Sequence, residues 1–229
     1  MKTIGLIGGI TWHSTMDYYR LINELTNQRL GGVHSARIIL HSLEFDEIKT
    51  LTQQLDWDAL ADLMKFHAKK IEAAGAECLL IGANTMHHIA DIVQDAINIP
   101  LIHVAGAVGE VIKERHIKQV ALLGTKYTMQ MNFYKGRLAQ KGIAVLIPGE
   151  EDIVFIDDAI YNEMAKGQFL PQTGKRFISI IESLYRKGAE GVVFGCTEIP
   201  ILVKQEDCSL PIFDSALIHA SAAVDFALE

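Results

Sequence analysis

The chain has 229 residues, of which 49% are hydrophobic and 21% charged, and its net charge is −7. These values exclude a disordered chain and allow either one large hydrophobic core or two smaller ones. An acidic chain without a basic cluster is not expected to bind nucleic acid. No apolar run approaches the ~20 residues of a membrane span, and no secretory signal is visible, so we expect a cytoplasmic protein outside the membrane.

Three cysteines, Cys78, Cys196 and Cys208, occur without CxxC spacing. An odd number of cysteines at such spacings is typical of a reducing compartment and predicts neither a disulfide framework nor a zinc site. The nine histidines also lack the spacing of metal ligands. We therefore expect no bound metal.

Short runs of Ile, Leu and Val alternate with stretches of helical period. Several of these runs are apolar at consecutive positions, which is typical of strands covered on both faces. The alternation predicts parallel sheets with right-handed crossovers, an α/β fold. Helices are predicted from near Ser14 to Gly31-Gly32 and from about Leu60 to Gly75. The predicted strands are 3–7, 36–43, 77–81, 100–103, 119–123, 143–147, 191–195 and 211–213.

The chain also resembles itself. Residues 75–85 (GAECLLIGANT) align without gaps on residues 188–198 (GAEGVVFGCTE). A second matching pair lies upstream, since residues 4–9 (IGLIGG) correspond to residues 120–125 (VALLGT) at nearly the same spacing. We expect two similar α/β halves, which are residues 1–100 and 101–211, with residues 212–229 returning to the first half.

Four strand-to-helix junctions combine a glycine with hydroxyl or amide side chains. In open parallel sheets ligands bind beyond the carboxyl ends of the strands, and backbone N–H groups at helix starts attract anions. Each junction could be a helix cap alone, but the repetition in both halves favours a shared cleft. The predicted ligand-binding residues are Gly9, Asn84, Thr85, Thr125, Thr128, Thr197 and Glu198.

Cys196 follows an apolar strand and precedes a helix start marked by Pro200. Because a helix N-terminus lowers the pKa of a thiol, a reactive thiolate is expected there. Cys78 is interpreted as a core residue and Cys208 as a loop residue. Glu198 could orient a group near Cys196, contact an ammonium group or cap its own helix. His87 could reach the cleft or cap a helix.

Three motifs together resemble the aspartate/glutamate racemase family, and within it the broad-specificity bacterial amino-acid racemases. They are Gly8-Gly9 followed by residues 12–19 (WHSTMDYY), then residues 84–87 (NTMH), then residues 195–200 (GCTEIP). The resemblance covers essentially the whole chain. It implies two pseudo-symmetric parallel-sheet α/β domains with the active site between them, no pyridoxal phosphate or other cofactor, a small amino acid as substrate, and a homodimer.

The resemblance also implies two opposed cysteines, because racemisation needs an acid/base group on each face of the α-carbon. Cys196 carries over as one of them, whereas Ala83 occupies the equivalent position in the first half. Thr85, His87 or a held water could serve the second face. Alternatively, the chemistry is one-sided, as in the similar arylmalonate decarboxylases, or Ala83 marks a catalytically silent amino-acid-binding protein. We expect a cofactor-independent amino-acid racemase.

Overall fold

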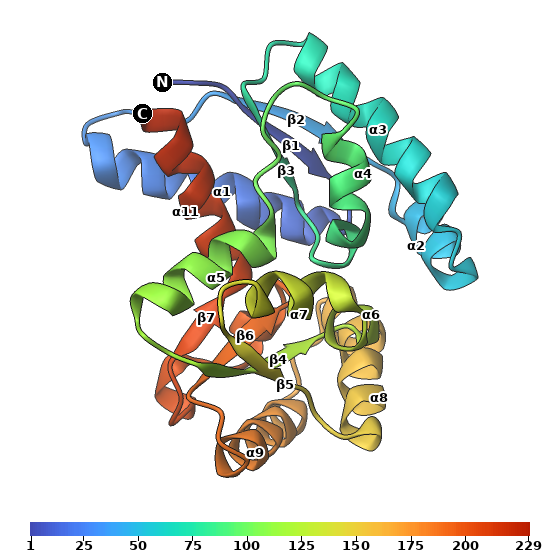
Figure 1. The fold of residues 1–229 in the computed structure, drawn as a ribbon, viewed down its shortest axis with the longest axis vertical. Coiled ribbons are helices and arrows are strands. Elements are labelled where there is room, and N and C mark those ends of the chain that lie inside the picture. Colours follow the sequence, from blue (N-terminus) through green and yellow to red (C-terminus); the bar gives the residue numbers. More distant parts are fainter. The chain divides into compact units, whose positions relative to one another are not determined.

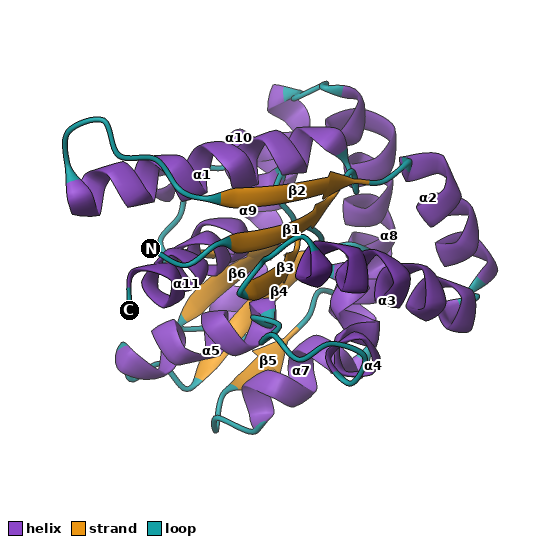
Figure 2. Ribbon diagram, turned by 90° about the horizontal axis from the view of Figure 1, so that it is seen from above, coloured by secondary structure: helices purple, strands orange, loops and turns teal.

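The computed structural model describes residues 1–229, which divide into two compact units. Unit 1 consists of Met1–His103 and His219–Glu229, and unit 2 consists of Val104–Ile218. Each unit contains a parallel sheet flanked by helices, which confirms the α/β class (Figure 1; Figure 2). No helix is both long and apolar enough to cross a membrane.

The sheet of unit 1 has the strand order β2-β1-β3, with all strands parallel. Its strands are β1 (Ile4–Gly8), β2 (Ile38–Ser42) and β3 (Cys78–Ile81). All residues of the central strand β1 are buried, as expected for a continuous apolar run.

Both helices predicted for unit 1 are present, within a few residues of their expected limits. The long helix α1 (Trp12–Leu30) starts after Thr11, whose side chain accepts a hydrogen bond from the Ser14 amide, and it stops at Gly31. The remaining helices are α2 (Phe45–Gln54), α3 (Trp57–Ala73), a 3-10 helix (Thr85–Ile89) and α4 (Ala90–Gln94), and α11 (Ser215–Leu228) enters unit 1 at His219.

The sheet of unit 2 has the order β5-β4-β6-β7 and is also parallel. Its strands are β4 (Gln119–Gly124), β5 (Ala144–Leu146), β6 (Gly191–Gly195) and β7 (Ile212–Asp214). In both units the first strand lies between the second and the third, so β3 and β6 occupy equivalent places. The segments that follow them, with Ala83 and Cys196, are therefore topologically equivalent.

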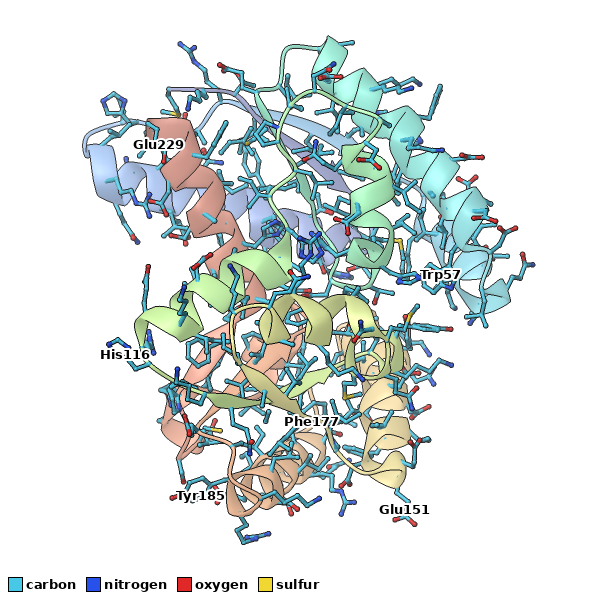
Figure 3. All side chains as sticks on the ribbon, in the orientation of Figure 1. Trp57, His116, Glu151, Phe177, Tyr185 and Glu229 are labelled. Atoms are coloured by element: carbon cyan, nitrogen blue, oxygen red, sulfur yellow. The ribbon has the colours of Figure 1, made fainter.

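Two hydrophobic clusters cover the faces of this second sheet. One contains Phe177 and packs beneath α8 and α9, while the other contains Phe213 and packs beneath α5 and α7. Figure 3 shows Phe177 inside unit 2, with Tyr185 and Glu151 at its surface. The helices are α5 (Val104–Glu114), α6 (Lys126–Gln130), α7 (Asn132–Ala139), α8 (Glu150–Asp158), a π-helical turn (Ala159–Glu163), 3-10 helices (Met164–Lys166 and Gln205–Asp207), α9 (Pro171–Arg186) and α10 (Ile199–Leu202).

Two sequence expectations differ from the structure. The predicted strand 100–103 is reduced to a single bridge between Leu101 and Leu79, because only Pro100 and Ile102 bond to the Leu79 backbone. The expected return to unit 1 at Ile212 differs as well, because β7 pairs with β6 and the chain enters unit 1 only at His219.

Candidate active site

Cys196 lies immediately beyond the carboxyl end of β6 and is buried. Its thiol donates a hydrogen bond of 2.9 Å to Oε2 of Glu198, and the Thr197 hydroxyl donates to the same oxygen over 2.8 Å. The Glu198 side chain makes no capping bond to α10. The hydrogen bond from Cys196 agrees with an orienting role for Glu198, whereas the capping role is not observed.

The expected lowered pKa of Cys196 is wrong. Burial raises the pKa of this thiol well above its ordinary value, and the adjacent Glu198 carboxylate raises it further. The helix that was expected to lower the pKa has only four residues, Ile199–Leu202, and its dipole is correspondingly small. At rest Cys196 is consequently a neutral thiol with its proton directed at a carboxylate.

The junction after β4 lies next to the Cys196 junction, because Gly124 pairs with Gly195. Thr125 caps α6 by accepting a 3.3 Å hydrogen bond from the Thr128 amide, and the two threonine hydroxyls lie 3.2 Å apart. A Cβ atom on Gly195 would lie only 2.9 Å from Cγ2 of Thr128. The predicted residues Thr125, Thr128, Thr197 and Glu198 are thus gathered at one edge of the unit 2 sheet.

The equivalent edge of unit 1 carries Gly9, Asn84 and Thr85, since β1 and β3 are neighbours. Asn84 and Thr85 are buried at the start of the 3-10 helix. The Gly9 amide donates a 2.7 Å hydrogen bond to Thr15 Oγ1. Gly9 also has a positive φ of 86°, and a Cβ atom there would meet the Leu43 carbonyl oxygen at 2.1 Å. Close backbone packing accounts for this glycine.

His87 is buried beside Ala83, and its Nδ1 lies 2.9 Å from the Ala83 carbonyl oxygen. A carbonyl only accepts, so Nδ1 carries the proton and neutral His87 keeps its lone pair on Nε2. The ring also packs edge-on against His103 and His219, with centroid distances of 4.8 and 5.3 Å. The sequence left open whether His87 was a cap or a cleft residue. The structure places it in a buried histidine cluster.

His219 completes this cluster and was missed from the sequence. Its Nε2 donates to the Ile102 carbonyl oxygen over 2.6 Å, so Nδ1 accepts the hydroxyl of Tyr18 at 2.9 Å. Burial lowers the pKa of His219 to about 3, and the nearby His87 ring would repel a second protonated imidazole and acts in the same direction. Tyr18 and His219 lie near opposite ends of the sequence, and no local pattern marks them as partners.

Tyr161 was also missed. It lies in the π-helical turn Ala159–Glu163, and the neighbouring residues Ala159 and Ile160 share a hydrophobic cluster with Cys196. Burial raises the pKa of Tyr161, and the carboxylate of Asp157 raises it further. A tyrosine within a helical segment has no sequence signature of a site. The π-turn itself, a feature frequent at functional sites, becomes visible only in the structure.

The other two cysteines lie away from this junction. Cys78 is fully buried at the start of β3, where burial raises its pKa to about 11. Cys208 follows the 3-10 helix Gln205–Asp207 and is half-buried against the core of unit 2. No group of three or more His, Cys, Asp or Glu side chains is arranged to hold a metal ion.

Comparison with known proteins gives consistent matches along the chain. The sequence profile of the Asp/Glu/Hydantoin racemase family matches residues 7–223. A candidate Asp/Glu racemase from Yersinia pestis has 44% identity and a TM-score of 0.94, and an aspartate racemase homologue from Pyrococcus horikoshii has 35% identity and a TM-score of 0.88. Both alignments cover 100% of each chain.

A further relative is the broad specificity amino-acid racemase RacX of Bacillus subtilis. It is 23% identical over 177 residues, which are 74% of this chain and 73% of RacX. The family match spans nearly the whole chain and includes both topologically equivalent junctions. The chain therefore belongs to the Asp/Glu/hydantoin racemase family, as its motifs predicted, and is an isomerase of the pyridoxal-phosphate-independent amino-acid racemase class.

Proposed function

We propose that this enzyme racemises or epimerises a small amino acid, with Cys196 as an acid/base group that shares its proton with Glu198. The observation that carries this proposal is the 2.9 Å hydrogen bond from the buried thiol to Oε2 of Glu198. Relatives named as an aspartate racemase homologue and as a broad specificity amino-acid racemase support the substrate class.

Cys196 and Glu198 together can either donate a proton to the substrate or remove one from it. As an acid, the thiol beside a protonated Glu198 gives its proton to the planar carbanion of the substrate, and it then takes back the proton of Glu198, which restores a thiol beside a carboxylate. As a base, the thiol first passes its proton to Glu198, which leaves a thiolate beside a neutral carboxylic acid. This thiolate then removes the α-proton and becomes a thiol again. The total charge of Cys196 and Glu198 is −1 before and after the internal transfer, so the transfer leaves no second buried anion.

Substrate binding is assigned to the polar junctions. We propose that hydrogen-bond donors at the junctions that carry Thr125, Thr128 and Thr197 bind the substrate together with those at Gly9, Asn84 and Thr85. Such donors stabilise the enediolate-like charge that develops on the carboxylate when the α-proton leaves. Glu198 contributes to the reaction by accepting and returning the proton of Cys196.

His87 is our choice for the second acid/base group. A base needs a nitrogen lone pair, and when His87 is neutral the bond from Nδ1 to the Ala83 carbonyl places that lone pair on Nε2. The hydroxyl of Thr85 is a much weaker base than an imidazole near neutral pH. His87 also follows the segment of Ala83, which is topologically equivalent to that of Cys196.

Deuterium exchange tests this assignment one enantiomer at a time. Each enantiomer of a panel of amino acids is incubated in deuterated water, and α-deuterium is measured by NMR. We expect Cys196→Ala to abolish racemisation and to stop exchange of one enantiomer, while His87→Gln stops exchange of the other. Cys208→Ala is the matched cysteine control and should exchange normally. If no amino acid exchanges its α-proton, the racemase proposal fails.

One-sided chemistry is the second candidate, and Ala83 favours it because an alanine methyl group cannot transfer a proton. In that case a substituted malonate loses one carboxylate as carbon dioxide, and Cys196 protonates the resulting carbanion from one face. The product would be a single enantiomer, which chiral chromatography detects. Stabilisation by an amino acid without exchange or decarboxylation would instead indicate a silent binding protein.

The resemblance also implies a homodimer, and the cysteine pattern favours a location in the cytoplasm. We adopt both as part of the proposal, and sedimentation of the purified protein tests the dimer. A monomeric protein that racemises normally would remove the dimer and leave the chemistry intact.

A further inference from the structure

A cavity of about 320 Å³ lies within unit 2, and Cys196 is not among the residues that line it. It is formed by the end of α5, the segment from α10 to the following 3-10 helix, strand β7 and the first turn of α11. Figure 1 shows α5 next to β7, and Ile112 of α5 shares a hydrophobic cluster with Phe213 of β7. The cavity has the size of a small-molecule site.

The walls of this cavity are largely apolar. Phe213 is buried in the wall, Val111 and Ile218 are half-buried, and Leu217 is exposed at the rim. These side chains come from three elements, α5, β7 and α11, and are in place without a ligand. They provide a surface on which the apolar part of a small molecule can be removed from water.

Two basic side chains, Arg115 and Lys204, also line the cavity, and neither forms a salt bridge. The guanidinium carbon of Arg115 lies 5.2 Å from the centre of the Phe213 ring. The Lys204 ammonium donates a 2.6 Å hydrogen bond to the carbonyl oxygen of Pro200. Each contact holds a positive charge at the wall but does not neutralise it. In a chain with a net charge of −7, two such charges at one cavity favour an anionic ligand.

Asp214 is the one carboxylate in the lining, and it has a structural role. Its Oδ1 accepts hydrogen bonds from the amides of Ala216 and Leu217 over 2.9 and 3.2 Å, which caps the start of α11. The nearby Asp207 accepts from the backbone amide of Lys204 and makes no salt bridge with its ammonium group. The charge around the cavity is therefore positive on balance.

We propose that this cavity binds a small carboxylate that carries an apolar group. The carboxylate pairs with Arg115 and Lys204, and the apolar group lies against Phe213 and Leu217. An α-amino acid fits less well, because its ammonium group would be added to two existing positive charges. The cavity does not include the Cys196 junction, so the inference is independent of the racemase reaction.

Three compounds with the same apolar ring test the ligand class. Cyclohexylacetate, cyclohexylethanol and cyclohexylglycine are titrated into isotope-labelled protein at pH 7, and the shifts of the backbone amides of Val111, Arg115 and Leu217 are followed by NMR. We expect cyclohexylacetate to shift these amides with a Kd on the order of 1 mM. The uncharged alcohol should bind at least about fivefold more weakly, and the amino acid should also bind more weakly than the acid.

Arg115→Gln and Lys204→Gln test the two cations. Each variant should bind cyclohexylacetate about fivefold more weakly, because one charged partner of the carboxylate is lost, and should bind the alcohol like the wild type. Lys175→Gln is the matched control, since Lys175 is an exposed lysine of α9 away from the cavity, and it should bind the acid normally. The melting temperatures of all three variants should match that of the wild type.

Equal binding of the acid and the alcohol would overturn the inference, and so would unchanged affinity in both cavity variants. Shifts centred on the amides of Thr125 and Cys196 would place the acid at the candidate active site instead. Tighter binding of cyclohexylglycine at the cavity amides would contradict the ligand class, and the absence of saturable shifts would remove the site. None of these outcomes depends on whether the enzyme racemises an amino acid.

Discussion

The hydroxyl of Tyr18 donates a hydrogen bond of 2.9 Å to Nδ1 of His219, although 201 residues separate the two in the chain. Tyr18 belongs to α1 and His219 to α11, and both side chains are fully buried. The bond ties the C-terminal helix to the first helix of unit 1. It also requires an imidazole that stays neutral, because a charged ring could not accept at Nδ1.

The neutral His219 predicts a specific dependence of stability on pH. In the unfolded chain its pKa is about 6.5, whereas burial lowers it to about 3 in the fold. Its contribution is therefore complete above pH 6.5 and is lost as the pH falls from 6.5 towards 3. Between pH 7 and pH 5 we expect a loss of up to about 2 kcal/mol in the free energy of unfolding.

Urea unfolding at the two pH values measures this loss. His219→Gln should be less stable at pH 7 and should lose about 2 kcal/mol less than the wild type on acidification. His34→Gln is the control, because His34 is exposed in a loop and should leave the profile unchanged. Parallel profiles for His219→Gln and the wild type would contradict the prediction.

Replacing Glu198 should separate the reactivity of Cys196 from its catalysis. In Glu198→Gln the carboxylate that raises the pKa of the thiol is gone, so the thiolate fraction increases. Alkylation at pH 8 should become about tenfold faster. The glutamine cannot accept the thiol proton, and racemisation should fall about a hundredfold. Glu206→Gln, at an exposed position, serves as the control. If alkylation and racemisation both became faster in Glu198→Gln, Glu198 would not be the group that accepts the Cys196 proton.

Ala83→Cys tests the missing second cysteine. The new thiol would occupy the place that is equivalent to Cys196, and racemisation should increase at least tenfold if the site lacks a strong base there. The same substitution should restore α-proton exchange to His87→Gln. An unchanged rate in both backgrounds would show that the second acid/base group lies elsewhere.

Gly9→Ala should be strongly destabilising. Its Cβ would lie 2.1 Å from the Leu43 carbonyl oxygen, and its backbone has a φ of 86°. We expect a loss of more than about 2 kcal/mol from the clash and the backbone strain together. Gly167→Ala has a similar φ of 77° and open space around the new Cβ, so it should cost only about 1 kcal/mol. Similar losses for the two variants, measured by urea unfolding, would show that Leu43 can move aside.

The sequence predicts most of the fold because its signals are local. Apolar runs mark the buried strands, Gly31 ends α1, and the repeated spacing of strand and glycine places Ala83 and Cys196 at equivalent junctions. The segment 100–103 has the same apolar character but pairs only through Leu79. A single apolar run predicts that a segment forms a strand, but it does not identify the strand with which that segment pairs.

The chemistry of the site is less predictable for a similar reason. The position of Cys196 before a helix suggested a lowered pKa, but the helix is short, and burial with Glu198 has the larger and opposite effect. Burial depends on residues from several segments. Tyr18 contacts His219 across nearly the whole chain, and no sequence pattern marks that pair.

The buried hydrogen bond from Cys196 to Glu198 also has a consequence for oxidation. Peroxides attack thiolates, and a protonated, buried thiol offers them little to react with. The resting enzyme should therefore survive oxidants that inactivate proteins with exposed thiolates. The sulfur is expected to be open to oxidation only during turnover, when it has lost its proton. At that stage we expect the bound substrate to cover it.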